Sequence, residues 1–225
     1  MQNMSNSQIF KSTLPVMMGY VPLGLAFGLY AVGLGLTPPL AICTALLVYA
    51  GSAEFVLAAF IIAKANFLEV FFIIFLINFR HFFYTLSLLD EIKSLKIPYY
   101  FIYALTDETF AILKARSASG ANPRDLNRLY NLTAVLNHSY WVLGCAFGAF
   151  LGTALRLDYS GIEFSLCALF VVLAYEVFKK ERNFSVLSLA FGCAVIGLFI
   201  LPHRYYLFGV LIAGITLLCV FRRHF

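Results

Sequence analysis

Five ionisable side chains lie near the midpoints of three consecutive apolar segments of this 225-residue sequence. They are Glu54 in segment 39–63, Arg80 and His81 in segment 66–89, and Asp107 and Glu108 in segment 98–115. A charged side chain at the centre of a membrane-spanning helix costs about 2.5–3.5 kcal/mol on insertion scales, so such residues face a partner or a watery cavity rather than lipid. The sequence therefore predicts one polar layer near the middle of a membrane.

Two kinds of chemistry fit these side chains. In a functional interpretation, one of the carboxylates carries a proton, the Arg80 guanidinium adjusts its proton affinity, and His81 relays protons near neutral pH. In a structural interpretation, Arg80 pairs with Glu54 or Asp107 only to hold helices together, and His81 forms a hydrogen bond between helices. The sequence leaves both interpretations open.

Uncharged polar and small residues surround these charges and predict a substrate path. Asn78, His81 and Thr85 have i, i+3, i+7 spacing and share one helix face, while Tyr84 lies with Arg80 on the neighbouring face. The predicted path consists of Pro22, Gly24, Gly28, Tyr49, Gly51, Ser52, Asn78 and Tyr84.

Glycine and proline in the first apolar segment allow two interpretations. Pro22 removes a helix hydrogen bond, and Gly24 and Gly28 form a GxxxG step like those of Gly144–Gly152. Such steps allow helix backbones to pack closely. Alternatively, the first helix breaks here and a second break lies at Tyr49–Ser52, because broken helices at matching places in two halves mark the midplane site of many transporters. The free N–H and C=O groups of a break would suit the carboxylate and ammonium groups of an amino acid.

Composition predicts an all-α, polytopic integral membrane protein with one transmembrane domain, residues 1–225. Apolar residues make up 62% of the chain and charged residues 12%, about half the charged fraction of a soluble domain. We expect eight transmembrane helices, at about 14–36, 39–63, 66–89, 98–115, 129–156, 161–178, 184–201 and 204–221. If 98–115 does not span, seven remain. Lys and Arg divide eleven to four between the two sides for either count, so the positive-inside rule does not choose.

Two parts of the chain resemble each other weakly. The matches are GLAFG at 24–28 with GCAFG at 144–148, and YAGSAEF at 49–55 with YSGIEF at 159–164. Because the matches occur in the same order, we predict an internal duplication with broken helices, as in many transporters. The repeat-like halves would cover about 14–115 and 129–221, joined by the polar loop 116–128.

Other residues of chemical interest have simpler explanations. Ser160 and Glu163 fit a capping box, and Glu176 pairs with Lys179 and Lys180 at a helix end. The five cysteines form no CxxC pair, and the sequence has no HExxH, GxSxG or GxxxxGK[ST] motif. We therefore expect no catalytic residue, metal site or cofactor. The net charge of +5 reflects orientation in a lipid bilayer rather than binding to nucleic acid.

Four stretches of the sequence resemble the AzlC-type branched-chain amino-acid exporters, the large subunit of a two-component bacterial exporter. They are Pro15–Gly28 with Gly19, Pro22, Gly24 and Phe27; Tyr49–Phe55; Asn78–His81 with Tyr84; and Thr106–Glu108 with Phe110 and Ala111. The resemblance implies secondary active export of leucine, isoleucine and valine, with methionine as a further candidate, across the bacterial cytoplasmic (inner) membrane. It also implies a small AzlD-type membrane subunit as partner and the proton gradient as driving force. One departure is Glu54, where the family usually has Gln, so specificity and ion coupling stay open at this position.

Two other functions remain open from the sequence. A passive channel or facilitator for small solutes would need rings of polar residues along a path, whereas the sequence shows one midplane layer. A membrane scaffold subunit without its own transport path would tolerate joint replacement of Glu54, Arg80 and Asp107 by apolar residues.

Overall fold

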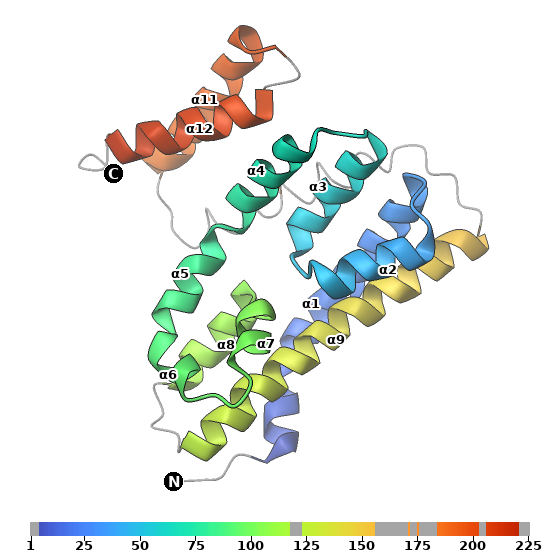
Figure 1. Cartoon of the computed structure of the whole chain (residues 1–225), viewed down its shortest axis with the longest axis vertical. Coiled ribbons are helices and arrows are strands. Elements are labelled where there is room, and N and C mark those ends of the chain that lie inside the picture. The colour runs from blue at the N-terminus through green and yellow to red at the C-terminus, as the bar shows by residue number, and fades with distance from the viewer. Residues whose placement is uncertain are drawn as a thin grey trace. The chain divides into compact units, whose positions relative to one another are not determined.

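The computed structural model of the chain describes residues 5–117, 123–155, 171, 175, 184–202 and 206–220. Within these ranges every regular element is helical and there is no strand, which confirms the all-α prediction. The chain divides into two compact units, Met1–Glu163 and Phe164–Phe225, and each is described by itself. Figure 1 shows the helices of both units.

The first unit is built on two long helices that lie side by side (Figure 1). α1 spans Asn6–Gly33, and α9 spans Pro123–Leu155, so α9 begins inside the segment expected to be a polar loop. The shorter helices between them are α2 (Pro38–Leu47), α3 (Gly51–Ile62), α4 (Phe67–Asn78), α5 (Arg80–Ser87), α6 (Leu89–Lys93), α7 (Pro98–Tyr103) and α8 (Asp107–Ser117).

Glycines allow α1 and α9 to touch backbone to backbone. A Cβ atom added to Gly28 would lie 2.3 Å from the carbonyl oxygen of Cys145, and one added to Gly148 would lie 2.2 Å from that of Leu25. At Gly24 the nearest backbone oxygen would be 2.9 Å away. No side chain fits at these distances, so only glycine allows the two backbones to approach this closely at the GxxxG steps.

The predicted break in the first helix is wrong. α1 is continuous, with both Pro15 and Pro22 inside it. The Pro22 side chain is exposed, whereas Gly24 and Gly28 are buried against α9. Because Pro22 lies outside the contact with α9, the close packing of the glycines can hold the helix together across the one hydrogen bond that proline removes.

Three other expected spans are broken near their middle. The first break is the one predicted at Tyr49–Ser52, where α2 ends and α3 begins. The second lies at Phe79, where α4 and α5 meet at an angle of 41°. The third lies at residues 104–106, between α7 and α8. The sequence predicted only the first of these breaks.

The described part of the second unit is a pair of apolar helices, α11 (Phe184–Ile200) and α12 (Tyr206–Val220). They pack at Gly197, where an added Cβ would lie 2.4 Å from a methyl carbon of Val210. Their bounds agree closely with two of the expected spans. The expected span 161–178, with its two glutamates, lies outside the described residues apart from positions 171 and 175.

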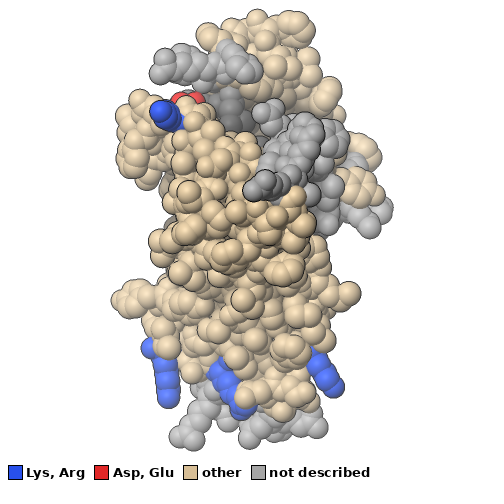
Figure 2. All heavy atoms as spheres, turned by 90° about the vertical axis from the view of Figure 1, so that its right-hand side faces the viewer, with Lys and Arg blue, Asp and Glu red and all other residues tan. Residues whose placement is uncertain are grey.

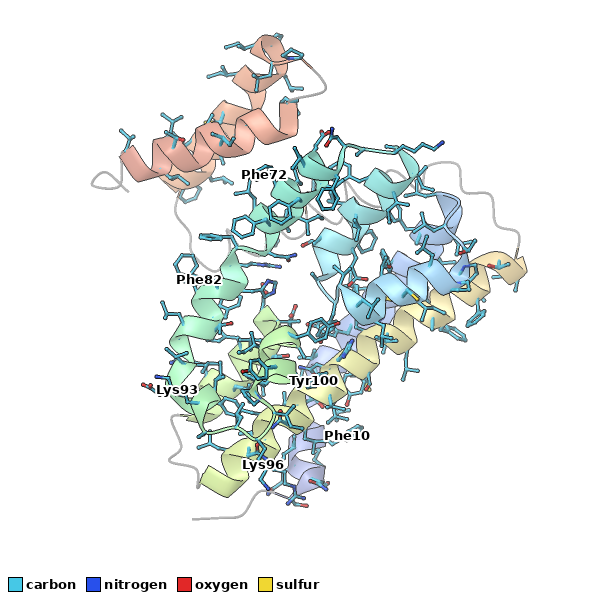
Figure 3. The ribbon with its side chains drawn as sticks, in the orientation of Figure 1. Phe10, Phe72, Phe82, Lys93, Lys96 and Tyr100 are labelled. Atoms are coloured by element: carbon cyan, nitrogen blue, oxygen red, sulfur yellow. The ribbon has the colours of Figure 1, made fainter. Side chains whose placement is uncertain are left out.

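Two helices are long and apolar enough to cross a membrane among the described residues: α1 and the Leu126–Leu155 part of α9. The bent pair α4 and α5 adds a third if it is counted as one span. Many large apolar side chains are exposed, including Phe72 at 45% and Phe82 at 59% on α4 and α5 (Figure 3). On the face shown in Figure 2, an uncharged band separates Lys and Arg side chains near one end from the few charged side chains near the other. Such an exterior suits contact with lipid; the count of eight or seven spans stays a prediction.

Candidate functional site

Each predicted ionisable residue lies in the first turn of a half-helix that follows a break. They are Glu54 in α3, Arg80 and His81 in α5, and Asp107 and Glu108 in α8. The first N–H groups of a helix have no intrahelical partner and carry partial positive charge. They stabilise a carboxylate of the protein in that turn, and they can also bind an anionic group of a ligand.

Glu54 is fully buried and forms no ion pair with any residue that the structure describes. Its Oε1 atom accepts hydrogen bonds from the backbone N–H of Ala50 and from the indole Nε1–H of Trp141, both at 2.9 Å. Its Oε2 atom is buried and has no hydrogen-bond partner in the described part of the chain. Glu54 therefore ties the α2–α3 link to α9 with one oxygen and leaves the other unsatisfied.

The link between α2 and α3 has an unusual backbone. Tyr49 has a φ of 45° and Gly51 a φ of 31°, and for a bulky tyrosine this region is strained. The buried Tyr49 ring lies 4.4 Å, centroid to centroid, from the ring of His138 on α9. The Tyr103 hydroxyl on α7 donates to the carbonyl oxygen of Leu46 in the last turn of α2. Side chains of α7 and α9 thus hold the strained link.

Arg80 pairs with Asp107 and not with Glu54. The Arg80 Nη1 atom lies 2.5 Å from Asp107 Oδ2, and His81 Nε2 lies 3.9 Å from the other carboxylate oxygen. The side chains of Arg80 and Asp107 are 43% and 34% exposed. This pair joins the starts of α5 and α8 and decides between the two partners that the sequence left open for Arg80.

A series of polar side chains joins the start of α8 to α1 and α9. The Tyr20 hydroxyl oxygen on α1 lies 2.6 Å from Glu108 Oε2 and 2.8 Å from Thr106 Oγ1. The Thr109 hydroxyl is 3.1 Å from that of Thr106, and it accepts a hydrogen bond of 2.9 Å from Asn137 Nδ2 on α9. All of these side chains except that of Glu108 are buried. The first turn of α8 is therefore fixed to the α1–α9 pair.

Sequence reasoning missed the residues with which α1, α7 and α9 contact the broken helices: Tyr20, Tyr103, Asn137, His138 and Trp141. The Tyr20 and Trp141 rings lie 5.7 Å apart, centroid to centroid. A signal was available, because Asn137 and His138 form a polar pair in the middle of an apolar segment. Trp141, the single tryptophan of the chain, follows Asn137 one turn later on the same helix face.

Five residues of the predicted substrate path come from α1 and the start of α3. Gly24 and Gly28 are packing residues of the α1–α9 contact, and Pro22 is exposed beside it. Gly51 and Ser52 lie half-buried in the first turn of α3, next to Glu54 in the chain. Gly51 and Ser52 thus share the first turn of α3 with the buried carboxylate, whereas Pro22 is exposed on α1.

Of the other three residues of the predicted path, Tyr49 lies on the strained link described above, and Asn78 and Tyr84 lie on α4 and α5. The Asn78 carbonyl oxygen is 3.1 Å from His81 Nδ1, and the ring of Tyr84 stacks on that of Phe110 on α8 with centroids 4.8 Å apart. Tyr84 therefore reinforces the α5–α8 contact made by the Arg80–Asp107 pair. Within the described ranges, no three His, Cys, Asp or Glu side chains are grouped so as to hold a metal ion.

Comparison with known proteins identifies the family. The family model described as AzlC protein matches residues 15–155. This chain belongs to the AzlC family. The matched range extends from α1 to the end of α9, so it contains every residue of the candidate site. The predicted resemblance is confirmed.

Relatives of this AzlC-family chain cover nearly all of its length. It is 33% identical over 217 residues to an uncharacterised membrane protein of Helicobacter pylori, covering 95% of this chain and 93% of that protein. It is 35% identical over 219 residues to an uncharacterised membrane protein of Haemophilus influenzae, covering 95% and 87%. It is 29% identical over 217 residues to the branched-chain amino acid transport protein AzlC of Bacillus subtilis, covering 95% and 84%. No solved structure matches the chain.

Proposed function

We propose that this chain is a multi-pass protein of the bacterial inner membrane that exports branched-chain amino acids in exchange for protons, together with a small AzlD-type subunit. Leucine, isoleucine and valine are the proposed substrates, with methionine as a further candidate. The name of the Bacillus subtilis relative supports the substrate class. The observation that carries the proposal is that three half-helices place ionisable side chains in their first turns, and that the carboxylates of two of them, Glu54 and Glu108, contact α9 and α1.

The parts of this site suit a zwitterion with an apolar side chain. The free N–H groups at the starts of α3 and α8 and the guanidinium group of Arg80 suit a carboxylate. The carboxylates of the site suit an ammonium group. Aromatic rings line the contacts between α1, α3 and α9, including Phe27 and Phe55 with centroids 5.2 Å apart. Such rings would accept a branched hydrocarbon chain.

Glu54 is the proposed proton-carrying residue. An ionised carboxylate taken out of water costs several kcal/mol unless a positive charge compensates it. Glu54 is fully buried and forms no ion pair with the described residues, whereas Asp107 is paired with Arg80 and Glu108 contacts Tyr20. In this proposal Glu54 therefore binds a proton whenever the site is closed and empty.

The proposed AzlD-type partner would cover charges that lipid does not tolerate. Arg80 and Asp107 are about a third or more exposed at the starts of two half-helices, and Phe79, which precedes Arg80 in the chain, is also exposed. A charged pair in a membrane faces protein or water rather than lipid. A second hydrophobic subunit is one such surface, and the family resemblance implies its presence.

A release experiment in cells tests the proposed export. A bacterial host without its own exporters is loaded with leucine-containing dipeptides, with and without this chain and a candidate small subunit, and internal leucine is followed over time. We expect faster leucine release when both chains are present. Equal release with and without them would contradict the export of leucine.

The same experiment at several external pH values tests the coupling. Export in exchange for protons should become faster as the external medium becomes more acidic at constant internal pH. Release that is independent of the proton gradient would leave a facilitator and contradict the exchange.

A further inference from the structure

The carboxyl group of Glu54 has a free acceptor position that the fold does not fill. Oε1 is occupied by the N–H groups of Ala50 and Trp141, while Oε2 is buried and has no partner within the described ranges. The N–H groups bring partial positive charge but no full cation. The site is therefore one positive charge short whenever the carboxyl group is ionised.

Aromatic rings pack around Trp141, the side chain that donates to this carboxyl group. Trp141, which donates to Oε1, contacts Tyr20 at 5.7 Å and Phe27 at 6.3 Å between ring centroids. Tyr20 also contacts Tyr49 at 6.5 Å. The faces of such rings attract an ammonium group, and a carboxylate among them adds an ionic hydrogen bond.

A metal ion suits this position poorly. No group of three His, Cys, Asp or Glu side chains exists in the part of the chain that the structure describes. Oxygen-preferring cations such as Ca²⁺ take six or more oxygen ligands, whereas Glu54 offers one free oxygen atom. An organic ammonium needs only a few acceptors and an aromatic surface, and the branched-chain amino acids of the proposed function carry one.

The neighbouring titratable groups supply no permanent cation. The titratable groups that interact with Glu54 are Tyr103 on α7 and Cys145 on α9. Tyr20 on α1 packs on Trp141 and contacts Glu108, Tyr30 packs on Phe55, and Tyr49 on the link packs on His138 of α9. Cys43 on α2 is exposed, and Glu69 on α4 lies in the first turn of its own helix. His138 alone among them can become positively charged, and its Nδ1 atom lies 3.1 Å from the Tyr100 hydroxyl.

We propose that Glu54 Oε2 is a single-occupancy site that takes either a proton or the ammonium group of the transported amino acid, so that the two compete for one carboxyl group. This inference rests on the proposed function and specifies how its substrate and proton exchange. When the amino acid arrives, the O–H bond of the Glu54 carboxylic acid breaks, the proton leaves to solvent, and the carboxylate pairs with the ammonium group. One positive charge occupies the site before and after the step.

The exchange requires the site to open, because Glu54 is closed from solvent in this structure. The strained link at Tyr49 and Gly51 lies directly before the helix that carries Glu54. Opening of α2 and α3 at this link would expose the carboxyl group and relieve the strain.

Proton release on ligand binding tests the competition directly. The full chain, with its candidate small subunit, is purified in lipid nanodiscs and mixed with ligand in weak buffer containing a pH indicator. The ligands are leucine, 3-methylbutylamine, which lacks the carboxylate, and 4-methylpentanoate, which lacks the ammonium group. We expect up to one proton released per bound leucine or amine and none for the acid. Once the site is mostly protonated, we also expect the affinity for leucine to fall about tenfold for each unit by which the pH is lowered.

Two glutamine variants provide the matched comparison. Glu54→Gln keeps the shape and the acceptor for Ala50 and Trp141, and we expect it to bind the two ammonium ligands at least about tenfold more weakly and to release no proton. Glu69→Gln changes a glutamate that also lies in the first turn of its helix, α4, and we expect it to behave like the wild type. Unchanged leucine affinity and pH dependence in Glu54→Gln would overturn the proposal.

If the Glu54→Gln variant does not fold, the measurement on the wild type still tests the proposal. Leucine binding without proton release at every pH would overturn the shared site, even if cells still export leucine. Binding of the amine with proton release but no binding of leucine would support the site and reject the proposed substrate. If neither leucine nor 3-methylbutylamine binds, the shared site is overturned.

Discussion

Arg80 and Asp107 show how residue types are readable from a sequence while residue partners are not. The sequence predicted that both lie in one layer, and the structure places them 2.5 Å apart at the starts of α5 and α8. The sequence could not choose between Glu54 and Asp107 as the partner of Arg80, because that choice depends on how each half-helix is rotated about its axis. Tyr20 was not predicted because, unlike Tyr49 and Tyr84, it has no charged residue close to it in the sequence.

Joint replacement of the pair separates a functional role from a structural one. Arg80→Met with Asp107→Leu removes both charges, so neither is left unpaired, and we expect the melting temperature to stay near that of the wild type. If Arg80 contacts the substrate carboxylate, leucine release should fall by about tenfold or more. The single variant Asp107→Leu, which leaves Arg80 unpaired, is expected to melt at a lower temperature. Wild-type release by the double variant would show that the pair only joins helices.

The helices show which local signals were sufficient. Hydropathy placed most of the apolar segments within a few residues, because a membrane span needs about 20 apolar residues. The helix break predicted from Pro22 was wrong, because other residues of α1 pack against α9 and the helix continues through Pro22. The break before α8 had a signal: Thr106 accepts a hydrogen bond from the Thr109 N–H at 3.3 Å, and Asp107 follows it. A threonine before acidic residues is typical of a helix start. The break at Phe79 has no glycine or proline nearby, so it could not be predicted from such residues.

The α1–α9 contact predicts a position-dependent effect of one added methyl group. Gly28→Ala places a Cβ 2.3 Å from a backbone oxygen of α9, so we expect a loss of about 1–3 kcal/mol and a lower melting temperature of the detergent-solubilised protein. Gly19→Ala on the same helix is the control, since its Cβ would meet nothing within 4 Å. It should be neutral or stabilising by up to about 1 kcal/mol. Equal melting temperatures for the two variants would contradict the backbone contact.

At the scale of the whole molecule, the family and the membrane class follow from the sequence, while the number of spans does not. Among the described residues, two helices qualify as spans by length and composition, and a third if the bent pair is counted. Broken helices such as α2 with α3 escape a length criterion, because each half has 10–12 residues. The positive-inside rule gives the same division of charges for seven and eight spans, so charge counting cannot replace a measurement of topology.

The position of the N-terminus distinguishes these two counts. With eight spans both termini are cytoplasmic, and with seven the N-terminus is outside. We expect an N-terminal epitope tag to be protected from protease in intact spheroplasts and cleaved after lysis, with a C-terminal tag as the internal control. Cleavage of the N-terminal tag in intact spheroplasts would contradict eight spans.

Transport by the purified protein against a gradient tests the central claim most directly. The chain and its candidate small subunit are reconstituted into liposomes, and labelled leucine is followed after a pH difference is imposed with equal leucine on both sides. We predict net leucine movement toward the acidic side, opposite to the flow of protons, and its loss in Glu54→Gln but not in Glu69→Gln. Leucine that stays equally distributed in the wild type under a pH difference would contradict proton-coupled export.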